Sequence, residues 1–213
     1  MHPGYQRRGV SLMLRWKRSL RDLSLLTGAL MLLAAPPPPA YAQPAVPAEN
    51  LVNALIGLDA APDLDVAVLR QQALDRIKAK ADAAPLKRPP IAAQLLKLPQ
   101  FSVEVQFDAD SPIIRPDSYR TLGRIADTLQ DPALLAYGFL IVGHTESTGK
   151  REINLTLSQR RADSIRDVLV TTFKISSKRL QAVGLGEEQL RDAARPAAPV
   201  NQRIQVITVK TMP

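Results

Sequence analysis

The stretch that most constrains the fold joins a short apolar run to an amphipathic helix through a polar turn, over residues 137–169. Residues 137–142, YGFLIV, have the length and the β-branched content of a buried strand. The turn that follows, residues 143–149, reads GHTESTG. Apolar side chains then recur at helical spacing, at Leu157, Ala162, Ile165, Val168 and Leu169. The pattern predicts a strand, a turn and a helix, and the free backbone amides at the start of such a helix favour a bound anion.

Three polar side chains of this helix lie on the face expected to pack against the sheet. At about 100° per residue, Asn154, Ser158 and Arg161 fall within the same arc as the apolar side chains. The arginine needs a partner there, because an uncompensated buried charge costs several kcal/mol. Glu146 of the turn, the carboxylate of a ligand, or both can be that partner. Spacing alone leaves both a structural Arg–Glu pair and a ligand site open.

With these residues in view, the stretch resembles the signature of the OmpA-like (also MotB-like) peptidoglycan-binding domains. In words, that signature is Gly-His-Thr-Asp, a Gly three positions on, and then Asn-x-x-Leu-Ser-x-x-Arg-Ala. The chain matches it without gaps over twenty positions, with Gly143-His144-Thr145-Glu146, Gly149, Asn154, Leu157-Ser158 and Arg161-Ala162. One position departs from the family, because Glu146 stands where the family usually has Asp.

The resemblance implies non-covalent binding of the stem peptide of peptidoglycan through diaminopimelate, which carries an ammonium and a carboxylate at one stereocentre. Carried over, Glu146 takes the amino group and Arg161 takes the carboxylate. Thr145 and Asn154 match family positions that line the same pocket, and Arg203 matches the strand arginine of the signature. A guanidinium fork matches a carboxylate in a bidentate manner, and the amides at the helix start supply further donors.

The other elements of the domain follow from their own patterns. Residues 102–107 and 201–209 alternate apolar and polar side chains with a period of two, which predicts strands. Residues 117–130 predict a helix, capped by Asp117 or Ser118. Residues 179–187 resemble the family's third strand and its Gly-x-Gly-Glu turn. The family's Asn-Arg-Arg at the start of the last strand reads Asn201-Gln202-Arg203 here.

The resulting order is βαβαββ, which predicts an α+β fold of the OmpA-like type. It consists of a single mixed sheet with helices packed on one face. This domain is predicted over residues 99–210 and contains nearly all of the core.

An Ala/Pro-rich connector, residues 43–98, precedes the domain. An amphipathic helix is predicted near residues 63–83, and residues 49–55 can form a short helix. Neither is long enough to build a core alone. The connector therefore docks on the domain or binds a partner such as an envelope or outer-membrane protein, and the sequence leaves both open.

Residues 1–42 predict a secretory signal peptide. Six Lys and Arg residues precede or begin an apolar segment, residues 23–35, which is too short to span a bilayer comfortably. Ala40-Tyr41-Ala42 is an A-x-A cleavage site. Export to the periplasm follows, with association with the outer membrane or the cell wall. The alternative, that the segment is retained as a membrane anchor, stays open.

Charge and composition exclude several classes of function. Without the leader, the Lys and Arg count falls from 28 to 22 and the Asp and Glu count from 20 to 19, so the net charge falls from +8 to +3. With no basic cluster interleaved with aromatics, nucleic-acid binding is disfavoured. The chain has no cysteine, and His144 is the one histidine after the leader, so neither a metal site nor a cofactor is expected.

Enzymatic function is not expected. His144 is predicted to hydrogen-bond within the turn, and Ser158 to satisfy a helix carbonyl rather than act as a nucleophile. A cell-wall hydrolase would need a metal triad, a cysteine nucleophile or a recognisable carboxylate pair.

A rival hypothesis is a degenerate OmpA-like domain that acts as a scaffold or protein-interaction module of an envelope assembly without binding peptidoglycan. Pairing of Glu146 with Arg161 in a closed turn without a pocket would favour it. The sequence also leaves open whether the chain forms a homodimer.

Overall fold

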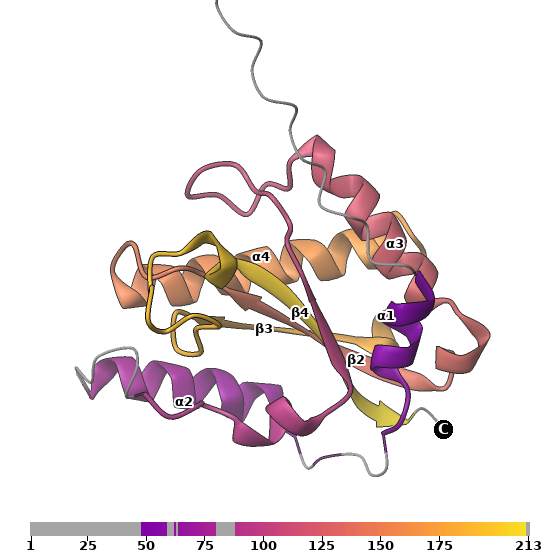
Figure 1. Ribbon diagram of the computed structural model, residues 1–213, viewed down its shortest axis with the longest axis horizontal. Coiled ribbons are helices and arrows are strands. Elements are labelled where there is room, and N and C mark those ends of the chain that lie inside the picture. The colour runs from indigo at the N-terminus through magenta and orange to yellow at the C-terminus, as the bar shows by residue number, and fades with distance from the viewer. Residues whose placement is uncertain (1–47, 59–61, 63, 80–87, 212–213) are drawn as a thin grey trace, which may run out of the picture. The chain divides into compact units, whose positions relative to one another are not determined.

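The computed structural model describes residues 48–58, 62, 64–79 and 88–211. In this part of the chain, four strands form one sheet in the order β1-β4-β2-β3 (Figure 1). The strands are β1 (Gln100–Val103), β2 (Tyr137–His144), β3 (Leu180–Gly186) and β4 (Arg203–Thr211). β2 pairs with β3 in parallel, whereas β4 is antiparallel to both β1 and β2. The single mixed sheet of the predicted α+β class is therefore confirmed.

Within the described residues, four α-helices accompany the sheet: α1 (Ala48–Leu55), α2 (Val66–Lys78), α3 (Tyr119–Leu129) and α4 (Arg151–Thr171). Short 3₁₀ turns connect them: η2 (Ala93–Lys97), η3 (Pro116–Ser118), η4 (Pro132–Leu134), η5 (Ser177–Arg179) and η6 (Pro199–Asn201). In chain order, β1, α3, β2, α4, β3 and β4 reproduce the predicted βαβαββ arrangement.

One face of the sheet is covered by α3 and α4, as predicted for the helices of the domain. Successive strand residues point to opposite faces, so Phe139 and Ile141 of β2 share one face. They pack in one cluster with α3 and α4, which also takes in Leu51 and Leu55 of α1. The main members from the two long helices are Leu122, Ile125, Leu129, Ala162, Ile165 and Leu169.

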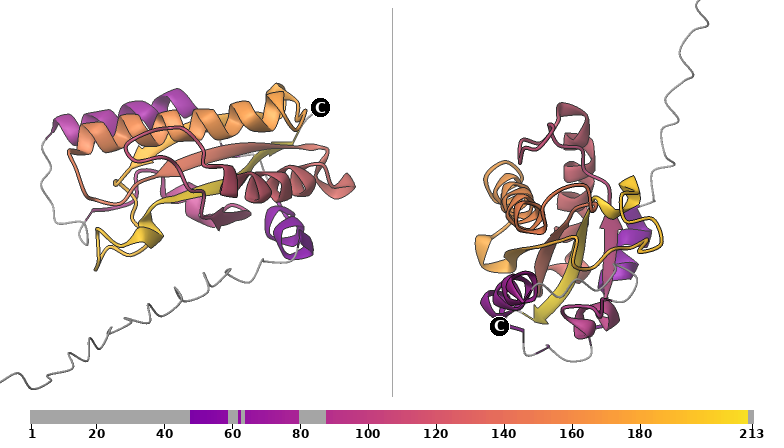
Figure 2. Two further views of the ribbon diagram at one scale, coloured as in Figure 1. Left: turned by 90° about the horizontal axis from the view of Figure 1, so that it is seen from above. Right: turned by 90° about the vertical axis from the view of Figure 1, so that its left-hand side faces the viewer.

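The opposite face is covered by the connector. Leu140 and Val142 of β2 pack in a second cluster with Val183 and Leu185 of β3. The connector contributes Leu69, Ala73 and Ile77 of α2 and Leu95 of η2 to this cluster. Helix α2 contacts both β3 and α4 (Figure 2). The sequence left open whether the connector docks on the domain or binds a partner, and the described connector residues dock on the domain. Helices therefore lie on both faces of the sheet.

Two glycines bring α4 close to the sheet. A Cβ atom at Gly143 would lie 2.3 Å from Ser158 O, and one at Gly184 would lie 2.1 Å from Gln159 N. No side chain fits in these gaps, so glycine sets the distance between helix and strands. Gly184 N also donates a hydrogen bond to Gln159 Oε1 at 2.7 Å.

Several boundaries differ from those predicted. β1 ends at Val103, and Phe107 instead forms an isolated bridge with Ile114. Ser118 does not cap α3, because its Oγ accepts a hydrogen bond from Gln106 N at 2.8 Å. α2 begins at Val66 behind an Asp65 cap and ends at Lys78, inside the predicted range of 63–83.

The predicted signal peptide, residues 1–42, lies outside the described residues. Among the helices within the described ranges, none combines the length and the apolar character needed to cross a bilayer.

Candidate functional site

A pocket of about 240 Å³ opens where the turn after β2 meets the first turns of α4 and the loop after β1. Thr145, Glu146, Asn154 and Arg161 line it, so the structure brings together four of the five predicted ligand residues. The other lining residues are Phe107, Asp108, Ala109, Asp110, Thr148, Leu157 and Gln202. The fifth predicted residue, Arg203, does not line this pocket.

Arg161 is held rigidly from α4. Its Nε donates to Ser111 O at 3.0 Å and its Nη1 donates to Gln202 Oε1 at 3.1 Å. Its guanidinium carbon lies 4.7 Å from the centre of the Phe107 ring, which adds a cation–π contact. Among the described residues no hydrogen-bond partner reaches Nη2. The arrangement fixes the guanidinium plane and leaves part of its fork for a ligand.

The charge of Arg161 is balanced at a distance rather than by a direct pair. Burial lowers the pKa of Arg161, and the carboxylates of Asp110 and Glu146 act in the opposite direction. Asp110 was not predicted as a site residue, although it lines the pocket beside the arginine. The pocket therefore contains one guanidinium and carboxylates from two different loops.

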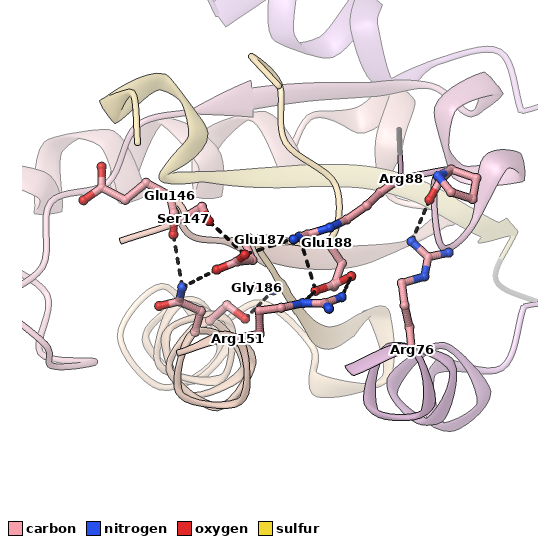
Figure 3. Close-up of polar contacts among 11 residues, drawn as sticks. Arg76, Arg88, Glu146, Ser147, Arg151, Gly186, Glu187 and Glu188 are labelled. Carbon is pink, nitrogen blue, oxygen red and sulfur yellow. Dashed lines mark hydrogen bonds and ion pairs between the residues drawn. The ribbon is translucent and has the colours of Figure 1, made fainter. Parts of the chain in front are cut away.

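Glu146 remains separate from Arg161. No ion pair among the described residues joins the two. The nearest hydrogen bond to the Glu146 carboxylate comes from Thr148 Oγ1 at 3.5 Å, and the Glu146 carbonyl accepts from Asn154 Nδ2 at 3.3 Å. Figure 3 shows the carboxylate turned away from the polar cluster around Glu187. The turn is thus open, with an anion and a cation apart in one pocket.

Thr145 carries a polar group that the described protein atoms leave unpaired. Its side chain is 3% exposed, and Oγ1 has no hydrogen-bond partner in the part of the chain that the structure describes. An unpaired buried hydroxyl costs about 1–3 kcal/mol. Thr145 lines the pocket, although Oγ1 itself is buried.

His144 is a structural residue of the sheet. Its Nε2 lies 3.0 Å from Gln205 Oε1, and Gln205 Nε2 donates to Gln100 Oε1, so the network assigns the proton to His144 Nε2. Burial, and then the charge of Arg203, lowers the pKa of His144 to about 3. The predicted bond within the turn is wrong, because the partner lies in β4. No group of His, Asp and Glu suited to a metal ion occurs among the described residues.

Arg203 lines a different pocket, of about 400 Å³, together with Arg191 and Glu104. Its Nη1 donates to Asn201 O at 3.3 Å and its Nη2 donates to Gln189 O at 3.1 Å. Gln202 lies beside Arg161 instead. Gln202 lines this second pocket as well as the first, whereas Arg203 lines only the second of the two.

Ser158 is fully engaged in structure. Its Oγ donates to Leu155 O at 2.9 Å and accepts from Gly186 N at 2.8 Å. The predicted bond to a helix carbonyl is confirmed, and the second bond ties α4 to the end of β3.

A cluster of buried carboxylates lies next to the turn that carries Glu146 and Ser147 (Figure 3). Glu187 Oε2 accepts from Asn154 Nδ2 at 2.7 Å, and Glu187 Oε1 accepts from Ser147 Oγ at 2.8 Å. Glu188 accepts two bonds from Arg151, at 2.8 and 2.7 Å. Glu187 and Glu188 are 3% and 2% exposed. Sequence reasoning noted Glu187 only as part of a turn, since nothing in its spacing links it to α4.

Residues 106–204 match the model of the OmpA family. Outer membrane porin F of Pseudomonas fluorescens is 34% identical over 116 residues, which are 53% of this chain and 34% of that protein. Peptidoglycan-associated lipoprotein of Mesorhizobium japonicum is 40% identical over 83 residues, which are 39% of this chain and 48% of that protein. This chain thus spans between a third and a half of the length of these relatives.

Among solved structures, the peptidoglycan-associated lipoprotein from Burkholderia pseudomallei is 29% identical, with a TM-score of 0.41, over 58% of this chain and 98% of that one. The family match covers α3, β2, α4, β3 and the start of β4, and therefore the pocket. The chain carries a domain of the OmpA family at residues 106–204.

Proposed function

We propose that this chain binds peptidoglycan non-covalently in the periplasm, through the diaminopimelate of the stem peptide, and so anchors an envelope component to the cell wall. The observation that carries the proposal is the pocket itself, in which Glu146 and Arg161 face one space without pairing. An amino-acid centre presents an ammonium and a carboxylate together. A site for it needs an anion and a cation that are both free to bind.

Each lining group has a part in this proposal. Arg161 binds the ligand carboxylate through Nη2, because its Nε and Nη1 already donate to Ser111 and Gln202 and so fix the guanidinium plane. Glu146 binds the ammonium. Thr145 lines the same pocket beside Glu146. Asn154 positions the Glu146 carbonyl from α4.

The names of related proteins support the proposed partner and location. Two of the proteins that the chain resembles are a peptidoglycan-associated lipoprotein and an outer membrane porin. Their names place them at the cell wall and at the outer membrane, which are the partner and the location proposed here.

The rival scaffold function predicted a closed turn with Glu146 bonded to Arg161. The open pocket and the unpaired carboxylate favour ligand binding instead. We infer no catalysis, because Ser158 and His144 are both engaged in structural hydrogen bonds. Homodimerisation and envelope partners of the connector stay predictions from the sequence.

The test is co-sedimentation of the full chain, purified after export, with diaminopimelate-type peptidoglycan. We expect the parent to sediment and Arg161→Ala to lose it, because removing one partner of a buried hydrogen-bonded charge pair costs about 2–5 kcal/mol, or at least about 30-fold in affinity. Arg166→Ala is the matched control, since Arg166 lies on the same helix, is 41% exposed and, among the residues that the structure describes, pairs with its neighbour Asp167 alone.

Thermal unfolding of each variant checks that the fold is kept. Lysine-type peptidoglycan, which lacks the second carboxylate, should sediment the parent weakly. Equal sedimentation of the parent and a folded Arg161→Ala chain would show that this pocket is not the binding site.

A further inference from the structure

The connector is described again from residue 88, and residues 89 and 90 contact α2. Residues 88–90 return beside α2, where Arg76 Nη1 donates to Pro89 O at 2.6 Å and Arg76 Nη2 donates to Pro90 O at 3.4 Å (Figure 3). The apolar side of α2 is buried on the sheet. The position of Arg88 is thus set by the docked helix.

From this position Arg88 reaches the buried carboxylate cluster. Its Nη1 lies 3.3 Å from Glu187 Oε1 and 3.8 Å from Glu188 Oε1. The Arg88 side chain is 11% exposed, and those of the two glutamates are 3% and 1% exposed. Two adjacent carboxylates at such burial repel each other and are costly unless cations compensate them. Arg151, from α4, pairs with Glu188, and the connector supplies the cation that contacts both.

Glu187 transmits this contact to the ligand loop. Its two carboxylate oxygens hold Ser147 and Asn154. Ser147 follows Glu146 directly, and Asn154 Nδ2 also donates to Glu146 O at 3.3 Å. Three hydrogen bonds in series therefore link the connector arginine to the Glu146 backbone: Arg88 donates to Glu187, and Asn154 donates both to Glu187 and to Glu146 O.

We propose that Arg88 is a positioning residue for the peptidoglycan pocket. With the connector docked, Arg88 balances Glu187, and Glu187 then holds Ser147 and Asn154 so that the Glu146 loop keeps its ligand-binding conformation. The inference rests on the proposed function of that pocket. Because coupling between two equilibria is reciprocal, a bound ligand also strengthens the docking of the connector.

The first measurement is the affinity of the full chain for soluble diaminopimelate-containing muropeptides. Couplings of this kind typically change affinity by about 5–150-fold, and we expect Arg88→Ala to weaken binding within that range. Arg88→Lys should restore most of the affinity, because it keeps a cation beside Glu187. Arg76→Ala should weaken binding in the same direction, since it releases residues 88–90 without removing a group that touches the glutamates. Arg166→Ala again serves as the matched control.

The second measurement separates positioning from loss of fold. In the absence of ligand, Arg88→Ala should shift the side-chain amide resonance of Asn154 and speed hydrogen exchange at residues 146–149, while β2 and β4 keep their protection. In the parent, muropeptides should slow hydrogen exchange in α2, and in Arg161→Ala they should not.

The outcomes are distinct. A folded Arg88→Ala chain that binds muropeptides as tightly as the parent overturns the positioning role and leaves the proposed function standing. A parent that binds no muropeptide overturns both. Binding by the parent without any protection of α2 rules out the reciprocal coupling, and with it the inference.

Discussion

Glu146 sets its carboxylate one methylene further from the backbone than an aspartate would. Because it is not bonded to Arg161, this longer side chain is free to meet an ammonium in the pocket. We expect Glu146→Gln to weaken muropeptide binding by about tenfold or more, since it removes the charge of a charge-assisted hydrogen bond worth about 1.5–3 kcal/mol. Glu146→Asp should stay within a few-fold of the parent.

Isothermal titration with a purified muropeptide measures both variants. Unchanged affinity of Glu146→Gln would mean that another group, such as Asp110, takes the ammonium.

His144 makes stability depend on pH in one direction. The histidine of the unfolded chain gains a proton near its usual pKa of 6.5, whereas burial and the charge of Arg203 keep the folded pKa at about 3. Between these values the unfolded state binds more protons, so the free energy of unfolding falls as the pH falls. Above pH 6.5 the residue adds no pH dependence.

Urea unfolding should show this loss, about 2 kcal/mol between pH 6.5 and 5, as the difference between the parent and His144→Asn. In NMR spectra of the folded chain, the His144 ring should stay neutral at pH 5. A ring titrating near 6.5 would contradict the structural role.

The residues of the pocket divide into those that sequence could place and those that it could not. Thr145, Glu146, Asn154 and Arg161 belong to one strand–turn–helix unit, where spacing translates directly into geometry. Gln202 lies 41 residues from Arg161 along the chain and meets it only through sheet pairing. The side chain that fixes the guanidinium therefore could not be predicted from the local pattern.

At the scale of elements, the contact between α4 and β3 depends on a missing side chain. A Cβ at Gly184 would meet backbone atoms of Gln159 and Ser158 at 2.1–2.6 Å, and backbone cannot rotate away. We expect Gly184→Ala to lower the free energy of unfolding by at least about 1–3 kcal/mol. Gly123→Ala is the matched control, because the nearest atom to its Cβ is a Phe173 ring carbon at 3.7 Å.

Chemical denaturation with a two-state fit measures both substitutions. If Gly184→Ala were as stable as Gly123→Ala, α4 would have room to move outward, and glycine would not set its distance from the sheet.

The sequence patterns predict which segments form helices and strands, but not which elements pack against each other. Alternation and helical spacing gave β4, α3 and α4 close to their observed bounds. β1 ends at Val103, before the predicted end at residue 107. Phe107 pairs with Ile114 inside a loop, and the alternation of apolar and polar side chains does not predict such a pairing. The apolar stripe of α2 fits docking or a partner equally well, and only the facing side chains Val183 and Leu185 decide between them.

At the scale of the whole molecule, the described connector residues outside the family match pack on the same sheet as the domain. The family model covers residues 106–204, whereas α2 and residues 88–98 pack on the sheet that this domain forms. The buried cations and carboxylates next to the turn that carries Glu146 are drawn from both parts. The behaviour of the pocket should therefore be studied on the full chain.

The side chains of α4 that hydrogen-bond to β3 also occupy backbone amides at one edge of the sheet. In the order β1-β4-β2-β3, the edge strands are β1 and β3, and exposed edges are where strands of other molecules add and aggregation begins. On β3, amides of Gly184 and Gly186 already donate to Gln159 and Ser158. β1 is four residues long and α1 contacts it. Within the described residues, both edges of the sheet thus offer little template for the addition of strands from other molecules.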